Sequence, residues 1–140
     1  MMTNQEIIEK YKQIIKDSAE RIVEKIGVAH TESVYRNAMA IELREFFDNI
    51  QMEYPVAFTY KEIIVGQGYI DLFISTVDTM KGVNPQWTFF PIELKHQKTK
   101  VNNEDSKEQL LKYLNTEPFR TNCKFGFLVE FPASSKSSVN

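Results

Sequence analysis

Residues 69–75 read YIDLFIS and contain the most informative irregularity of the chain. Ile70, Leu72 and Ile74 alternate with the other residues of this run, and an apolar period of two predicts a β-strand. Aspartate is disfavoured inside strands, yet Asp71 lies in the middle of the run with no turn residue beside it. Two interpretations follow: an edge strand with Asp71 facing solvent, or a carboxylate that binds a metal or takes part in catalysis.

A second apolar strand, predicted at about 87–95, ends in a pair of opposite charges. Glu93 and Lys95 share one face of this strand because residues i and i+2 point the same way, whereas Ile92 and Leu94 point to the other face. An acidic-x-Lys pattern occurs twice in the chain, about as often as chance predicts. The copy at Glu93-Leu94-Lys95 is more significant than the other, because it ends an apolar strand that follows an Asp-bearing strand. The alternative is a surface salt bridge, worth less than about 1 kcal/mol.

The remaining elements follow from periodicity and from end signals. Thr3 and Glu6 form a capping-box pattern, the apolar residues behind them recur at helical spacing, and Gly27 is a plausible stop. The predicted elements are helices at about 4–26, 31–49 and 104–115 and strands at about 52–60, 69–75, 87–95 and 123–131. Gly66 and Gly68 allow a bulge or a sharp bend between strand segments.

Glu32 lies at the start of the second predicted helix, and it is a charged residue at a position where the helical pattern predicts an apolar one. On a helical wheel it lies near the centre of the apolar face, which holds Tyr35, Met39, Leu43, Phe46 and Ile50. The helix dipole favours an acid in the first turn, but it does not explain an inward direction. The neighbouring His30 is expected to be a loop residue, and Cys123 to fill the last strand.

Gln109 and Tyr113 lie at i and i+4 on the third predicted helix, beside a stripe of leucines. This spacing brings both side chains to one side of the helix, where they could hydrogen-bond at the rim of a cleft. The alternative is an ordinary boundary tyrosine that is packed by its ring.

Size and charge limit the function classes. The chain has 140 residues, 16.3 kDa and a net charge of -2, which predicts a single domain at 1–133 followed by a polar, disordered tail at 134–140. The charge excludes a strongly basic nucleic-acid coat and a polycationic membrane binder, but an enzyme that acts on nucleic acid needs only a local basic path.

Cysteine content and hydropathy indicate the compartment. One cysteine excludes an intrachain disulfide and a Cys-based zinc site. No apolar run approaches the length of a membrane-spanning helix, and the N-terminus begins as an amphipathic helix rather than a signal peptide. We therefore expect an intracellular protein that does not associate with a membrane and that is located in the cytoplasm or the nucleus.

Taken in order, these features resemble the PD-(D/E)xK nuclease superfamily, and more closely its GxxExxY branch. The matching residues are Glu32, Tyr35, Asp71, Glu93-Leu94-Lys95, Gln109, Tyr113 and the strand Gly126-Phe127-Leu128-Val129. Two positions depart from the branch pattern: Ala29 replaces its glycine, and Glu130-Phe131 replaces its usual Asn-Phe pair. The resemblance covers about residues 26–131. It implies a restriction-endonuclease-like αβββαβ core, a small mixed sheet flanked by helices, with the helix at 4–26 as an addition that packs on the core or forms a dimer contact.

The resemblance also implies a function, a metal-dependent nuclease acting on nucleic acid, with DNA as the expected substrate and Mg²⁺ or Mn²⁺ as cofactor. Asp71, Glu93 and the backbone carbonyl of Leu94 would ligate the metal, and Glu32 would join through a metal-bound water or a second metal. Lys95 would hold the attacking water, and Gln109 and Tyr113 would orient Lys95, a phosphate or the substrate strand. The implied contacts to nucleic acid are Lys98, Lys100 and Tyr35.

Two other functions stay open. A nuclease fold can be kept as a binding or assembly module with little activity, although the intact charged positions argue against degeneration. The small size leaves open a homodimer or membership of a larger complex. A small-molecule enzyme of another class has no supporting Gly-rich phosphate loop or nucleophile motif.

Overall fold

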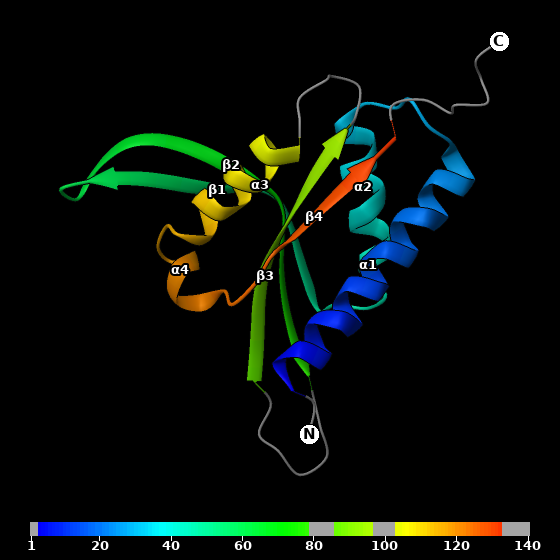
Figure 1. Cartoon of the computed structure of the whole chain (residues 1–140), viewed down its shortest axis with the longest axis horizontal. Coiled ribbons are helices and arrows are strands. Elements are labelled where there is room, and N and C mark those ends of the chain that lie inside the picture. Colours follow the sequence, from blue (N-terminus) through cyan, green and yellow to red (C-terminus); the bar gives the residue numbers. More distant parts are fainter. Residues whose placement is uncertain (1–2, 79–85, 97–102, 133–140) are drawn as a thin grey trace.

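The computed structural model describes residues 3–78, 86–96 and 103–132. Its elements are α1 (Asn4–Ile26), α2 (Glu32–Leu43), β1 (Asn49–Tyr60), β2 (Ile63–Asp78), β3 (Gln86–His96), α3 (Asn103–Leu114), α4 (Phe119–Asn122) and β4 (Phe127–Phe131). Four strands form one sheet in the order β1-β2-β3-β4 (Figure 1). The first three strands pair antiparallel, and β4 runs parallel to β3. The predicted αβββαβ core with a preceding helix is confirmed.

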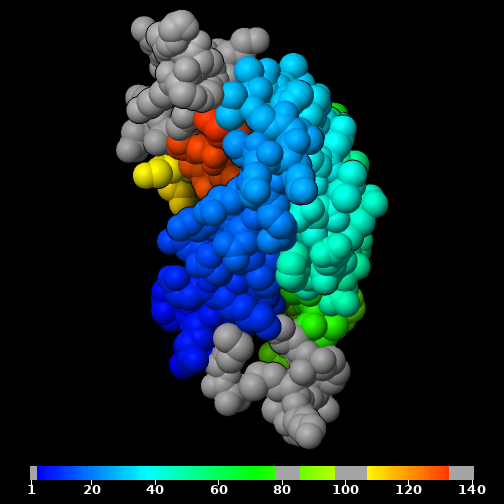
Figure 2. Space-filling view, turned by 90° about the vertical axis from the view of Figure 1, so that its right-hand side faces the viewer, coloured from blue at the N-terminus to red at the C-terminus, as the bar shows by residue number. Residues whose placement is uncertain are grey.

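Helices cover both faces of the sheet. α1 and α2 lie together on one face (Figures 1 and 2). α1 has the predicted capping box at Thr3 and is capped at its C-terminus by Gly27, whose amide donates to the Val23 carbonyl at 2.8 Å. Its buried residues recur every three or four positions, at Tyr11, Ile15, Ser18 and Ile22. The helix that lies outside the family motifs therefore packs on the core.

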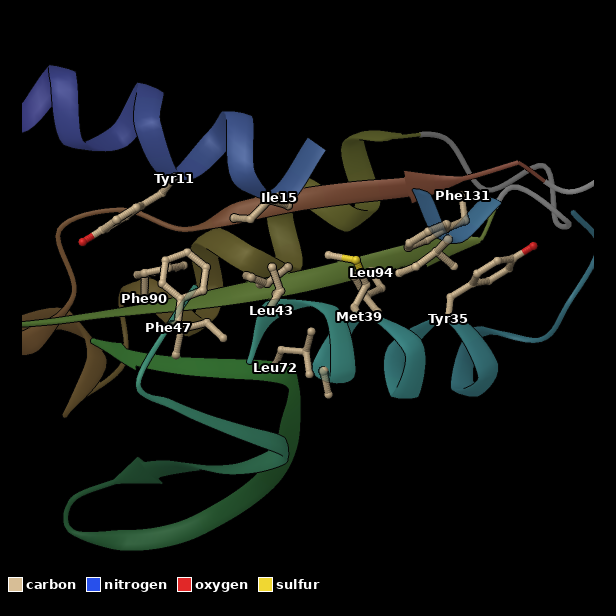
Figure 3. Packing of buried hydrophobic residues seen from close by; sticks show 14 residues of the cluster. Tyr11, Ile15, Tyr35, Met39, Leu43, Phe47, Leu72, Phe90, Leu94 and Phe131 are labelled. Carbon is tan, nitrogen blue, oxygen red and sulfur yellow. The ribbon is translucent and has the colours of Figure 1, made fainter. Parts of the chain in front are cut away.

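Aromatic rings form the centre of this core. Tyr11 of α1 stacks on Phe90 of β3, with ring centroids 5.3 Å apart, and meets the edge of Phe47 at 5.1 Å (Figure 3). At the other end of the same layer, Tyr35 of α2 stacks on Phe131 of β4 at 4.3 Å. Such contacts add to the burial of apolar area, so they fix α1 and α2 against β3 and β4.

The opposite face holds a smaller cluster beneath α3 and α4. Phe73 of β2 contacts Tyr54, Phe89 and Phe119, with ring centroids between 4.7 and 6.3 Å apart. Asp71 and Phe73 are i and i+2 on β2, and alternation along the strand directs both toward this side. This face, and not the one covered by α1 and α2, carries the acidic residue of β2.

β1 and β2 form a long hairpin arm that extends past α3 and α4 (Figure 1). Its tight turn places Lys61 and Glu62 at positive φ, 50° and 68°, the backbone that two-residue hairpin turns use. The register shifts between Phe58 and Thr59, close to Gly66, where the sequence predicts a bulge. The distal residues of the arm, Tyr60, Ile63, Ile64 and Val65, are exposed.

Several predicted boundaries are wrong. β1 begins at Asn49 rather than at 52, and β2 runs over Ile63–Asp78 rather than 69–75. α2 ends at Leu43 rather than near Asn49, because the chain turns and pairs Asn49 with Ser75 of β2. Asp48 fixes this turn, since its carboxylate accepts from the Thr76 hydroxyl and the Val77 amide, both at 2.9 Å. As a result Phe47 enters the core instead of the predicted Phe46, which is exposed.

The last strand is also shorter than predicted. Its strand residues begin at Phe127 instead of 123, because α4 and an isolated bridge from Cys123 to Phe89 precede it. Cys123 is buried. The predicted tail at 134–140 lies outside the described residues. Within the described part of the chain, none of the helices combines the length and the hydrophobicity needed to cross a bilayer.

Candidate active site

Two carboxylates meet where β2 and β3 separate. The ladder of paired residues ends at Leu72 and Ile92, and the next residues in this register are Asp71 and Glu93. Here side chains replace backbone carbonyls as acceptors. The Asp71 amide donates to Glu93 Oε1 at 3.0 Å, and the Leu94 amide donates to Asp71 Oδ2 at 2.8 Å. The two side chains are therefore held in fixed positions side by side.

The surroundings of this pair favour protonated carboxyl groups in the absence of a cation. Burial raises the pKa of Asp71 to about 6, against the lowering effects of the Leu94 amide and of Arg36. Burial is also the largest cause that raises the pKa of Glu93, to about 8, and the negative charge of Asp71 is the second. Two like charges close together in a partly dry site cannot both ionise cheaply. A divalent cation would remove that cost.

Lys95 lies beside this pair in one small pocket. The pocket has a volume of about 160 Å³ and is lined by Glu32, Tyr69, Asp71, Glu93, Leu94, Lys95, Gln109 and Leu128. Lys95 and Glu93 are i and i+2 on β3, as the sequence predicts, and both are turned away from the core beneath α1 and α2. The structure thus places a basic residue among those that line an acidic pocket.

Glu32 reaches the same pocket, but it stands apart from the pair. Glu32 is exposed, which corrects the expectation that its side chain faces inward. Its charge still contributes to the raised pKa of Asp71. Within the described residues, no group of three or more His, Cys, Asp or Glu side chains is arranged to hold a metal. Glu32 therefore lines the pocket without joining the closely held pair of Asp71 and Glu93.

Sequence reasoning missed Arg36 and its partner Glu53. Arg36 follows Glu32 by one helical turn, and its Nη2 lies 2.9 Å from Glu53 Oε1. Its positive charge lowers the pKa of Asp71, whereas the charge of Glu53 raises it. Only the i, i+4 spacing from Glu32 could have indicated that Arg36 faces the site.

Gln109 and Tyr113 hydrogen-bond across one turn of α3. Gln109 Nε2 donates to the Tyr113 hydroxyl at 2.8 Å. Tyr113 is buried and packs near Gly68 of β2, where an added Cβ would lie 2.9 Å from its hydroxyl oxygen. Gly68 therefore permits a close approach between the hairpin arm and α3, a different role from the predicted bend.

Tyr35 is placed as a structural residue, and its predicted contact with nucleic acid does not agree with its complete burial. Its hydroxyl donates to the Gly27 carbonyl at 3.0 Å and accepts from the His30 amide at 3.4 Å. These bonds hold the loop that leads into Glu32. The other predicted nucleic-acid contacts, Lys98 and Lys100, lie outside the described residues.

Within this loop Ala29 has φ 71°, a left-handed conformation that favours glycine. Ala29 occupies the position at which the GxxExxY pattern has its glycine. Ala29→Gly is therefore expected to raise the free energy of unfolding by up to about 1 kcal/mol, because relief of the left-handed strain exceeds the added chain entropy. Denaturant titration measures this change.

Ala57→Gly is the matched control for that substitution. Ala57 is an exposed residue within β1, and glycine in a strand costs about 0.5–1 kcal/mol. Equal destabilisation by both changes would contradict the proposed strain at Ala29.

A comparison with family models matches residues 9–140 to the PD-(D/E)XK nuclease superfamily. The chain belongs to this superfamily. Neither curated proteins nor solved structures gave a match. The sheet with flanking helices agrees with the restriction-endonuclease-like fold of PD-(D/E)XK proteins.

The donor groups in this PD-(D/E)XK chain fit a divalent cation. Two adjacent carboxylates and a peptide carbonyl at Leu94 are hard oxygen ligands, which Mg²⁺ and Mn²⁺ prefer. Burial, the main cause that raises the pKa of both acids, disfavours their negative charges, and a bound cation would offset that cost. A cation that keeps several of its waters needs few protein ligands, so a pair of acids is sufficient.

Proposed function

We propose that this chain is a metal-dependent nuclease that hydrolyses phosphodiester bonds in DNA. The observation that carries the proposal is the convergence of Asp71, Glu93 and Lys95 in one pocket, on a fold whose superfamily is one of nucleases. Assignment to the GxxExxY branch belongs to the same proposal. It is supported by Glu32 at the pocket and Tyr35 in the loop bonds described above.

Each residue has a defined role in this proposal. Asp71, Glu93 and the Leu94 carbonyl would hold the cation, and a bound cation would supply Lewis-acid activation of a water and of the scissile phosphate. The Lys95 ammonium orients the attacking water and neutralises charge that grows on the phosphate oxygens. Glu32 accepts a hydrogen bond from a water at the rim of the pocket.

The third helix would complete the site from the opposite side of the cleft. Gln109 lines the acidic pocket, and its bond to the buried Tyr113 restricts its side chain. A held amide can position a phosphate oxygen or Lys95 without the entropy cost of ordering a free side chain. Gln109 and Tyr113 are therefore proposed to orient the reacting groups.

The test is a cleavage assay with purified protein on DNA and on RNA, each with Mg²⁺, with Mn²⁺ and with chelator. We expect DNA cleavage that needs metal and that Glu93→Gln abolishes. Glu45→Gln is the control, because it removes the same charge from an exposed position after α2. A folded protein that binds metal and nucleic acid but cleaves nothing would contradict the nuclease and favour the binding module. Cleavage of RNA but not of DNA would keep the nuclease function and change the proposed substrate to RNA.

A further inference from the structure

A second and larger cavity continues from the acidic pocket. It has a volume of about 690 Å³ and lies between the hairpin arm and α3. We call it the aromatic groove and define it by Phe58, Tyr69, Glu108, Gln109, Lys112 and Tyr113. Tyr69 and Gln109 line both cavities. A ligand held at the acids can therefore extend directly into the groove.

Tyr69 presents an open aromatic ring at the junction of the two cavities. Its residue is 57% exposed, although it belongs to the same face of β2 as Asp71. Two residues of strand span about 7 Å, so the ring lies close to the point where a phosphate would meet the acids. The neighbouring Phe58 ring packs against Tyr113, with centroids 6.1 Å apart. The groove is thus walled by aromatic rings on the side of the hairpin arm.

The charges in the groove select against a phosphate as its occupant. Glu108 and Lys112 contribute one charge of each sign, and the Lys112 ammonium lies 4.7 Å from the centre of the Phe58 ring. The groove therefore has no excess of positive charge. Aromatic faces with amide hydrogen-bonding groups, supplied by Gln109 and Gln67, suit a flat, neutral and polar ring.

We infer that the aromatic groove binds an unpaired nucleobase next to the phosphate held at the acidic pocket, so that the substrate is single-stranded at the cleavage point. This inference rests on the proposed nuclease function. A base inside a duplex shows only its edges in the grooves, whereas an unpaired base exposes a face that stacks on Tyr69. Single strands, flaps and frayed ends are the substrates that offer such a base.

The test measures binding rather than cleavage. Lys95→Ala protein, in Mn²⁺, is titrated into a fluorescein-labelled thymidine 12-mer and, separately, into a blunt 12-base-pair duplex, with anisotropy as the readout. We expect the single strand to bind at least about tenfold more tightly. Adding Tyr69→Ala should weaken single-strand binding about tenfold, the size of one base stack, whereas Tyr69→Phe should bind like the parent.

Tyr60→Ala serves as the matched control, because Tyr60 is a similarly exposed tyrosine of the same arm that does not line the groove. A single 2-aminopurine in the strand gives an independent signal, since its fluorescence is quenched when it stacks on Tyr69. Equal binding of both probes, an unchanged affinity in Tyr69→Ala, or binding of neither probe would overturn the inference. Metal-dependent cleavage of duplex DNA by the wild-type protein would leave the proposed function intact in each of these cases.

Discussion

Lys95→Ala is expected to lower the rate of metal-dependent DNA cleavage at least about 100-fold, the effect of removing one charge stabiliser aimed at a transition state. Lys95 lies at the pocket that holds Asp71 and Glu93, and we propose that its ammonium stabilises the charge on the phosphate. Substrate affinity should change less than turnover, because charge on the phosphate grows toward the transition state. Single-turnover kinetics at saturating DNA separates the two effects.

The control for Lys95 is Lys124→Ala, which removes an equal charge from an exposed residue before β4. Its rate should stay within about twofold of the wild type. Thermal unfolding of both variants then shows whether the Lys95 change acts on the fold. Cleavage that survives Lys95→Ala unchanged would mean that the activity comes from a different site.

Asp71→Asn is expected to change the response of the protein to metal and to pH. In chelator at pH 8 the variant should melt at or above the wild-type temperature, because asparagine keeps the bond from the Leu94 amide and removes the repulsion with Glu93. Mn²⁺ at 100 times its dissociation constant should stabilise the wild type by about 2.7 kcal/mol. The variant should lose most of that gain. Four melting curves, each protein with chelator and with millimolar Mn²⁺, test both statements.

The pH dependence has a defined sign. The folded-state pKa values of Asp71 and Glu93 are raised, to about 6 and about 8, so in chelator their favourable contribution is complete at low pH. It is lost as the pH rises through these values, because ionisation costs more in the folded state. The stability of wild-type protein in chelator should therefore fall between pH 5 and pH 9, and more steeply than that of Asp71→Asn. Stabilisation by Mn²⁺ should grow over the same interval, since the cation competes with protons.

Asp48 provides a control, because its pKa shift and therefore its effect on the pH dependence of stability have the opposite sign to those of Asp71. Its pKa is lowered, first by the Val77 amide and then by the Thr76 hydroxyl, so its contribution to stability is present above the unfolded-state pKa and is lost in acid. Asp48→Asn should destabilise the protein at neutral pH and leave the response to Mn²⁺ unchanged. If Asp71→Asn behaved in the same way, Asp71 would be a structural residue and the binding module would replace the nuclease.

The positions of the acids could be predicted because they violate local preferences. Asp71 interrupts an apolar strand, and Glu93 and Lys95 share one face of the next strand, so the sequence alone predicts which side of each strand carries these charges. Their pairing depends on the β2–β3 register, which alternation helps to fix. The segment 63–78 forms one strand, because the irregularity beside Gly66 is a register shift in the pairing with β1 and does not end the strand.

What escaped prediction depends on contacts between distant segments. α2 ends at Leu43 without a glycine or proline to mark the place, since the turn is fixed by Asp48 reaching residues 28 and 29 positions away. A helical wheel that is extended through this turn therefore predicts that Phe46 is buried, whereas Phe47 is the buried residue. The aromatic groove was missed for the same reason, because Tyr69 and Lys112 come together only when the hairpin arm packs along α3.

The reciprocal bonds of Asp71 and Glu93 with backbone amides have a consequence for how the chain avoids misfolding. A slip of β3 by one residue against β2 would turn Glu93 and Lys95 toward the apolar layer beneath α1 and α2. Burying charges there without partners costs several kcal/mol, and both amide bonds would be broken. The same side chains that are proposed to act on substrate thus stabilise the correct β2–β3 register. A molecule in which the site is assembled cannot have β2 and β3 paired one residue out of register.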